Sequence, residues 1–320
     1  MNWLKGLFSA LFAFSVVIII GIYFLFNMPN NMTTETTLVI EKGSGSHQVA
    51  QQLHQAGVIS HPFLFKLIAR LSGTDKQLQA GEYVFLPHIS MYEALDILRR
   101  GEVHYRYITL PEGLTTAKIL QLIEKEKNLS GKISVKVQEG ELLPETYSYV
   151  MGEPRDNIIK RAKKAMADAL QEAWQQNQSD IIKTPKQLLI LASIIEKETG
   201  IAQERADVAS VFVNRLKIGM KLQTDPSVIY ALTKGQKDLG RKLYKKDLAI
   251  DSPYNTYKYY GLPPGPICNP GKEALMAAAN PGDSDYLYFV ATGKGGHHFA
   301  RTLKEHNRNV SLYRKQLKKK

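Results

Sequence analysis

The segment TPKQLLILASIIEKETG, Thr184 to Gly200, carries the clearest structural pattern in the chain. Thr184 is a favoured helix N-cap, Pro185 suits the first helical position, and Gly200 suits a left-handed residue after the last turn. Between them, apolar residues recur at helical spacing and extend almost around the cylinder. We therefore predict a helix that is buried on most sides, with the rest of a domain packed around it.

Two glutamates at the end of this predicted helix need an explanation, because burial makes ionised carboxylates costly. Glu196 and Glu198 are two positions apart, which places them about 200° apart around the helix. In projection Glu198 falls between Leu191 and Ile194, whereas Glu196 lies about twice as far from the mean apolar direction. Desolvation would raise the pKa of Glu198 and suit it to general acid catalysis. From this segment alone, two glutamates on a frayed last turn beside lysines are the simpler interpretation.

Downstream of this helix, tyrosine, asparagine, threonine, glutamine and proline gather in short strings. Aromatic faces stack on sugar rings and amides hydrogen-bond hydroxyls, so this composition is typical of a carbohydrate cleft. For any single tyrosine, packing against the core remains the favoured interpretation. The strings are KLQTDPSVIYA (Lys221 to Ala231), SPYNTYKYYGLPPGPICNPG (Ser252 to Gly271), DYLYFVATGKGGHHF (Asp285 to Phe299) and KEHN (Lys304 to Asn307).

The N-terminal segment predicts a membrane anchor. Gly6 to Phe26 contains 21 residues without a charge, which matches the roughly 20 that cross about 30 Å of hydrocarbon as a helix. Bulky residues run up to Phe26 with no small-residue cleavage site, so we prefer a retained anchor to a cleaved signal peptide. Lys5 precedes the span, and no Lys or Arg follows it before Lys42. We therefore expect residues 1–5 in the cytoplasm and the remainder exported.

Composition narrows the choice of partners. The chain has 320 residues, ordinary globular values of 44% hydrophobic and 22% charged residues, and a net charge of +12. These values exclude a mostly disordered chain and a polytopic membrane protein, and the length suggests two domains or one large one. One cysteine, Cys268, excludes an intramolecular disulfide framework. Basic charge favours polyanions, but export argues against nucleic acid and leaves anionic lipid or wall polymer. For the lysine-rich C-terminal tail, a solubilising end is the preferred interpretation.

The exported part divides into a linker and two regions, which makes the fold class α+β. Residues 27–36 are polar and turn-rich. Residues 37–103 predict a compact α+β module, and its opening strand, Gly/Ser loop and amphipathic helix, with a possible N-cap at Ser46, resemble the start of the glycan-binding LysM fold. Residues 104–320 predict a larger, mostly helical α+β domain. The elements expected in the module are strands at Thr37–Ile40 and Glu82–Leu86, a helix that follows Ser46 and stops at Gly57, and helices at Pro62–Leu71 and Ser90–Arg100.

Metal and cofactor motifs are weak throughout. GKGGHH, Gly293 to His298, lacks the ending of a phosphate loop and the spacing of a dinucleotide fingerprint. His297 and His298 are adjacent, and with His306 they form no recognised zinc pattern. We predict no metal site and no cofactor, and a structural or substrate-contacting role for His297.

Seven strings in order along the chain resemble the YceG-like family, the membrane-bound endolytic murein transglycosylases. The resemblance covers almost the whole chain, and it implies cleavage of the β-1,4 bond between N-acetylmuramic acid and N-acetylglucosamine inside peptidoglycan strands, leaving 1,6-anhydro ends. The strings are EGELLPETY (Glu139 to Tyr147), ASIIEKET (Ala192 to Thr199), VFVNRL (Val211 to Leu216), LQTDPSVIYA (Leu222 to Ala231), YNTY (Tyr254 to Tyr257), GLPPGPI (Gly261 to Ile267) and YLYFVA (Tyr286 to Ala291).

The resemblance also implies roles for single residues. The family's catalytic glutamate is the second of the EKET string, Glu198, which the helix projection selects independently. Glu198 would protonate the leaving glycosidic oxygen and then take the proton of the sugar's own C6 hydroxyl. Substrate-binding candidates match family positions that we expect in the cleft; they are Gln223, Asp225, Tyr254, Asn255, Tyr257 and Glu145.

Location and partners follow from the same resemblance. It implies a single-pass protein of the bacterial cytoplasmic membrane with its catalytic domain on the periplasmic side. Peptidoglycan strands are the expected substrate, peptidoglycan synthases are candidate partners, and termination of nascent glycan elongation is the expected role. Two alternatives stay open: a hydrolase with the same substrate, and a non-catalytic wall-binding scaffold.

Overall fold

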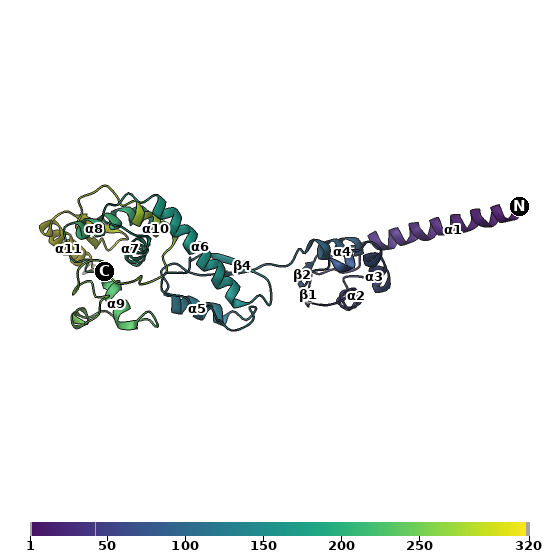
Figure 1. Ribbon diagram of the computed structural model, residues 1–320, viewed down its shortest axis with the longest axis horizontal. Coiled ribbons are helices and arrows are strands. Elements are labelled where there is room, and N and C mark those ends of the chain that lie inside the picture. The colour runs from purple at the N-terminus through teal and green to yellow at the C-terminus, as the bar shows by residue number, and fades with distance from the viewer. Residues whose placement is uncertain (1, 42, 318–320) are drawn as a thin grey trace. The chain divides into compact units, whose positions relative to one another are not determined.

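The computed structural model describes residues 2–41 and 43–317 and separates the chain into two compact units (Figure 1). Unit 1 comprises Met1–Arg106 and Ser148–Gly152, and unit 2 comprises Tyr107–Tyr147 and Glu153–Lys320. Helices predominate and the strands form small two-stranded sheets, so the class is α+β as predicted. Lys42 and residues 318–320, on which the topology and tail predictions draw, lie outside the described residues.

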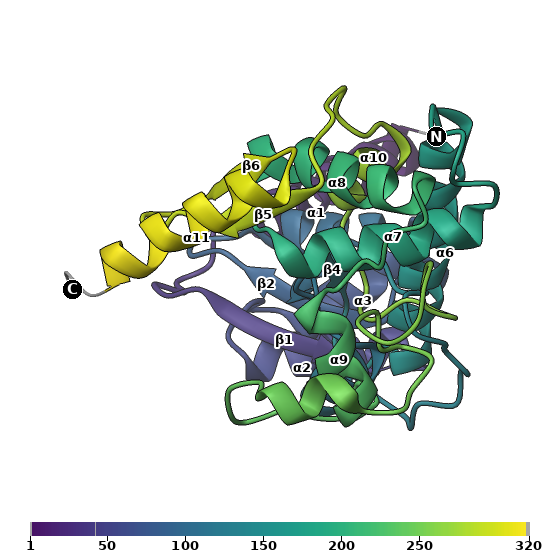
Figure 2. The same cartoon turned by 90° about the vertical axis from the view of Figure 1, so that its left-hand side faces the viewer.

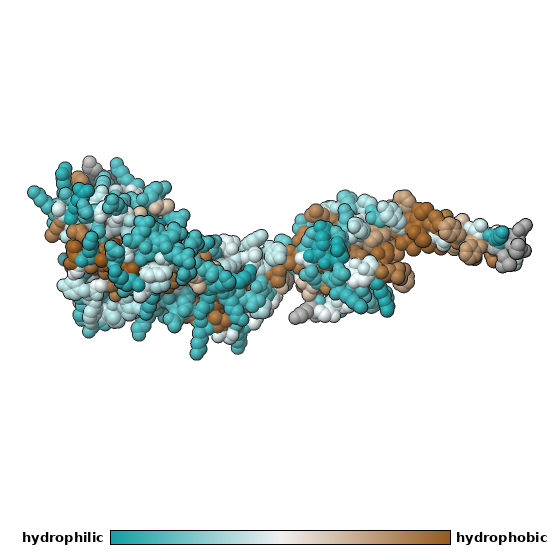
Figure 3. Space-filling model, turned by 45° about the horizontal axis from the view of Figure 1, so that its top comes forward, coloured by the Kyte–Doolittle hydropathy of each residue, from teal (hydrophilic) through white to brown (hydrophobic). Residues whose placement is uncertain are grey.

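Helix α1, Asn2–Asn27, contains the apolar N-terminal segment. Within the described residues it is the one helix long and apolar enough to cross a membrane, over Lys5–Asn27. Most of its side chains are exposed, and hydrophobic colouring follows it along most of its length (Figure 3). Phe26 is instead buried in the core of unit 1. The candidate anchor therefore ends inside the folded unit rather than in a free linker.

Unit 1 is built on an antiparallel pair of strands covered by helices. Its core includes Leu53, Phe65 and Tyr83, which have no exposed surface. Gly45 rather than Ser46 is the N-cap of α2, because Ser46 is already helical and makes no capping hydrogen bond. The elements are β1 (Thr36–Ile40), α2 (Ser46–Gln55), α3 (Pro62–Leu71), η1 (Thr74–Lys76), β2 (Gly81–Phe85) and α4 (Met91–Arg100).

Helix α7, Pro185–Glu198, lies at the centre of unit 2 (Figure 2). Its apolar residues are buried on nearly all sides, because α6 (Arg155–Gln175), α8 (Arg205–Lys217) and α10 (Lys272–Ala279) all pack against it. The helix begins as the sequence predicts, since the Thr184 hydroxyl accepts a hydrogen bond from the Gln187 N–H at 3.2 Å. The predicted buried helix is therefore confirmed as the core of the larger unit.

The predicted end of α7 at a left-handed Gly200 is wrong. Thr199 leaves the helix in an extended conformation, with φ −143°, and Gly200 does not have a positive φ. The Thr199 hydroxyl accepts a hydrogen bond from the Ile201 N–H at 3.1 Å, which satisfies the chain just after the helix. The Thr199 side chain, and not a left-handed glycine, therefore turns the chain at the end of α7.

The remaining elements of the larger region surround this helical core. Strands β5 and β6 form an antiparallel hairpin that α11 contacts, and α9 contacts α7. The elements are β3 (Arg106–Thr109), which pairs with β4 (Thr146–Tyr149), α5 (Thr116–Lys125), η2 (Ala202–Glu204), α9 (Asp225–Thr233), η3 (Lys245–Ala249), β5 (Tyr288–Ala291), β6 (His297–Ala300) and α11 (Leu303–Leu317).

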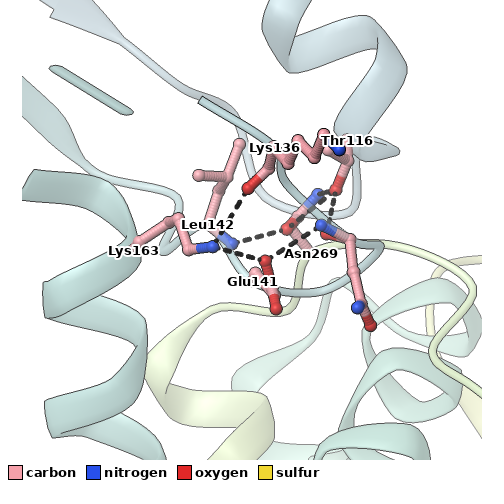
Figure 4. Close-up of polar contacts among 7 residues, drawn as sticks. Thr116, Lys136, Glu141, Leu142, Lys163 and Asn269 are labelled. Atoms are coloured by element: carbon pink, nitrogen blue, oxygen red, sulfur yellow. Dashed lines mark hydrogen bonds and ion pairs between the residues drawn. The ribbon is translucent and has the colours of Figure 1, made fainter. Parts of the chain in front are cut away.

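Asn269 joins distant segments of unit 2 through its buried amide (Figure 4). The amide nitrogen donates to the Leu114 carbonyl at 3.0 Å, and the amide oxygen accepts from the Leu142 N–H at 2.9 Å. The Thr116 hydroxyl lies beside the same amide nitrogen at 3.0 Å. Because a buried amide must find partners, this side chain fixes the proline-rich loop before α10 against the start of α5.

Candidate active site

A cavity of about 390 Å³ opens beside the last turn of α7. Glu198 enters it from α7 and Arg215 from α8, while Gln223 and Asp225 come from the segment that begins α9. Tyr257 and Tyr288 close other sides. Segments spread over a hundred residues therefore converge on one carboxyl group at a helix end.

The Glu198 carboxyl is half-buried in this cavity. Its pKa is raised to about 7, mainly by burial and also by the negative charge of Asp225. The neighbouring Thr224 hydroxyl and the positive charges of His297 and Arg215 act in the opposite direction. At neutral pH both protonation states of Glu198 are populated, so the group can donate a proton and later accept one.

Glu196 has different surroundings, as the helix projection predicts. Its carboxylate accepts a hydrogen bond from the Gly271 N–H at 3.0 Å. Burial is the main cause that raises its pKa, with the nearby Glu112 charge adding to it. Glu196 does not line the cavity. It fastens the start of α10 to the end of α7, which is a structural task.

Asp225 and Gln223 are held in defined positions at the cavity wall. The Tyr257 hydroxyl donates to Asp225 Oδ1 at 2.6 Å, and Asp225 also raises the pKa of that hydroxyl, after burial. Gln223 has a positive φ of 51°, and its N–H donates to the Thr256 carbonyl at 3.2 Å. Left-handed non-glycine residues are uncommon and concentrate at functional sites.

Three of the predicted substrate-binding residues do not line this cavity. Tyr254 packs against Tyr230, with ring centroids 4.9 Å apart. Asn255 has no exposed surface, and its amide donates to backbone carbonyls of residues 248 and 250 at 2.9 and 2.8 Å. Glu145 is exposed. Asn255 therefore shapes the loop that presents Tyr257 rather than facing the cavity.

Sequence reasoning missed Arg215 and His306. Buried Arg215 donates to the carbonyls of Leu287 at 2.7 Å and Leu222 at 2.6 Å, which joins two walls of the cavity. His306 stacks on Tyr288 with centroids 5.2 Å apart, and burial lowers its pKa. Both lie in strings that the sequence analysis singled out, VFVNRL and KEHN, but only the folded chain brings them to Glu198.

His297 does not line the cavity, and the Glu204 carboxylate holds it in place. The His297 Nδ1 lies 2.8 Å from Glu204 Oε2, and the His297 backbone N–H donates to Glu204 Oε1 at 2.9 Å. Among the described residues, no group of three or more histidine, cysteine or acidic side chains is placed to hold a metal ion.

Comparisons with known proteins give a consistent result. The model of the YceG-like family matches residues 38–312. A Bacillus subtilis protein named endolytic murein transglycosylase is 35% identical over 92% of this chain and 91% of its own length. A Streptococcus pneumoniae protein of the same name is 30% identical over 88% of this chain, which spans 59% of that longer protein. A crystal structure of a YceG-like protein from Listeria monocytogenes, 31% identical, covers 86% of this chain and 98% of its own with a TM-score of 0.54.

Proposed function

The chain belongs to the YceG-like family, and from this premise we infer that it is a peptidoglycan lytic transglycosylase, a lyase. The observation that carries the inference is the Glu198 carboxyl, whose pKa burial raises to about 7 inside a polar cavity. One group that can both give and take a proton at neutral pH is what an internal transglycosylation needs. The relatives named endolytic murein transglycosylase support the same activity.

We propose that Glu198 catalyses both proton transfers. The protonated carboxyl gives its proton to the glycosidic oxygen as the bond to C1 of N-acetylmuramic acid breaks. The resulting carboxylate takes the proton of the C6 hydroxyl as that oxygen bonds to C1, which closes a 1,6-anhydro ring. The proton balance is complete without water. In this proposal Asp225, Tyr257 and Gln223 hold the sugar in the orientation that brings O6 to C1.

The rest of the chain has a proposed role in placing this site. We propose that α1 anchors the protein in the cytoplasmic membrane with residues 1–5 inside and residues 104–320 outside. Residues 37–103 would act as a LysM-like glycan-binding module, and the β-α-α-β order of β1, α2, α3 and β2 supports that assignment. Cleavage of strands as synthases extend them would terminate glycan elongation.

Hydrolysis is a second candidate function, because a second carboxylate faces the same cavity. Asp225 lines it together with Glu198, and paired carboxylates of this kind serve glycosidases as acid and base. If Asp225 activates a water molecule, the product carries a reducing end instead of an anhydro ring. The two candidates predict different products from the same substrate.

Substitution of the two glutamates tests the assignment. We expect Glu198→Gln to reduce fragment release from purified glycan strands by at least about a thousandfold, because the amide is nearly isosteric but has no acidic proton to transfer to the leaving oxygen. Glu196→Gln is the matched control on the same helical turn and should retain most activity. Circular dichroism confirms that both variants fold. Near-normal turnover by folded Glu198→Gln, or complete loss only in Glu196→Gln, contradicts the assignment.

A further inference from the structure

A second cavity, of about 400 Å³, borders two of the helices that carry the candidate active site. The last turn of α7 supplies Glu198 to the first cavity and Lys197 to the second. The first turn of α9 likewise supplies Asp225 to the first and Pro226 to the second. Adjacent residues on a helix point about 100° apart, so the two cavities open on neighbouring faces of these helices.

This second cavity combines an apolar lining with a cationic edge. Leu114, Ile229 and Ile267 contribute apolar surface. The positive side chains around it are Lys118, Lys197, Lys237 and Arg241.

Among the described residues, one of these four cations, Lys237, has no acidic partner. Lys118 pairs with Asp238, and Arg241 pairs with Asp247 at 2.7 Å. The Lys197 ammonium donates to the Gly113 carbonyl at 3.2 Å and also interacts electrostatically with Glu196 and Asp238. Lys237 is exposed, and the described part of the chain offers its ammonium neither a hydrogen bond nor an ion pair. Such a site favours a ligand with carboxylates and small apolar side chains.

We propose that this cavity binds the stem peptide of the glycan strand whose sugar occupies the first cavity. The proposal rests on the proposed function, because it takes peptidoglycan as the substrate. In that polymer a short peptide hangs from the lactyl group of N-acetylmuramic acid and carries alanine methyl groups and free carboxylates. An extended tetrapeptide spans about 13 Å, which is more than the roughly 10 Å diameter of a helix and enough to pass from one face of α7 to the next. The peptide therefore reaches Lys197 and Lys237 while its sugar stays at Glu198.

Peptide binding by the full-length protein in detergent tests this proposal without requiring catalysis. The probe is synthetic lactoyl-L-Ala-D-Glu-diaminopimelate-D-Ala, and its counterpart is the same peptide with every carboxyl group amidated. Isothermal titration should give a Kd at least about tenfold weaker for Lys237→Glu than for wild type, since charge reversal repels a carboxylate. Lys245→Glu, an exposed lysine on η3 outside the cavity, is the matched control and should bind as wild type does. The amidated peptide should also bind about tenfold more weakly.

Cleavage rates give the second readout. Wild type should prefer peptide-bearing strands to strands stripped of peptides by an amidase, and Lys237→Glu should lose about tenfold of that preference in kcat/KM. Equal peptide affinity in wild type and Lys237→Glu, or no binding to wild type, overturns the proposal. If wild type cleaves neither kind of strand, the proposed function fails, while the titration still decides whether the cavity binds the peptide.

Discussion

The pKa of Glu198 is the residue-level property on which the proposed chemistry depends. A carboxyl with a pKa of about 7 is half protonated at neutral pH, whereas an exposed glutamate is almost fully ionised. The proton-donating form is lost as pH rises through the pKa. Activity should therefore fall above about pH 7, and any change that lowers the pKa should move that decline to lower pH.

Removal of the neighbouring charge tests this dependence. Asp225 raises the pKa of Glu198, so Asp225→Asn should move the alkaline limb of kcat/KM to lower pH by about half to one unit. The amide oxygen of asparagine still accepts a hydrogen bond from Tyr257, which keeps the wall in place. Glu145→Gln, an exposed carboxyl away from the cavity, is the control and should leave the limb where it is. An unchanged limb, or one moved to higher pH, contradicts this electrostatic account.

Some of the site could be predicted from the sequence and some could not, for a physical reason. The separation of Glu196 from Glu198 depends only on helical periodicity, which neighbouring residues determine. The left-handed backbone of Gln223 depends on contacts with segments far along the chain. The same is true of the hydrogen bonds that Arg215 donates to backbone carbonyls. The burial of Asn255, an apparent sugar-binding amide, likewise depends on the loop around it. Residue type alone does not distinguish an amide that binds substrate from one that holds a loop.

At the scale of single elements, local signals predicted some helix boundaries correctly and missed others. Pro62 and Thr184 begin or cap the predicted helices, because proline and threonine act on the adjacent backbone. Gly101 takes the left-handed conformation that ends α4, with φ 66°. Gly200 does not end α7 in this way, because the chain departs in an extended conformation toward η2. The sequence signal is the same for both glycines, and the tertiary path after the helix decides between them.

Asn269 shows how one side chain holds several elements together, and its removal should be costly. Asn269→Ala leaves the buried Leu142 N–H without its partner and removes the side-chain hydrogen bond to the Leu114 carbonyl, which keeps its bond from the Asn269 backbone N–H. We therefore expect a loss of about 2 to 4 kcal/mol in the free energy of unfolding. Urea unfolding followed by circular dichroism measures it. Thr184→Ala, which removes only the exposed α7 cap, should cost about 1 kcal/mol and sets the scale. A loss for Asn269→Ala no larger than that of Thr184→Ala would show that the network is not needed.

At the scale of the whole molecule, the division of the chain into units predicts separable functions. Deletion of residues 37–103 removes most of unit 1 but none of the residues that line the active-site cavity. We expect the deleted protein to cleave intact sacculi several-fold more slowly than wild type, because the proposed glycan-binding module is gone. Its activity on short purified strands should change less, and circular dichroism should show that unit 2 stays folded. Loss of folding would mean that the two units depend on each other.

The most direct test of the central claim, that Glu198 drives an internal transglycosylation, is mass spectrometry of glycan fragments produced in oxygen-18-labelled water. Internal transglycosylation should give fragments that end in 1,6-anhydro-N-acetylmuramic acid, lack the mass of one water relative to a hydrolysis product, and carry no label. Wild type should release them and Glu198→Gln should not. Reducing ends that carry one labelled oxygen would contradict the account, because water would then be the nucleophile and Asp225 the group to activate it.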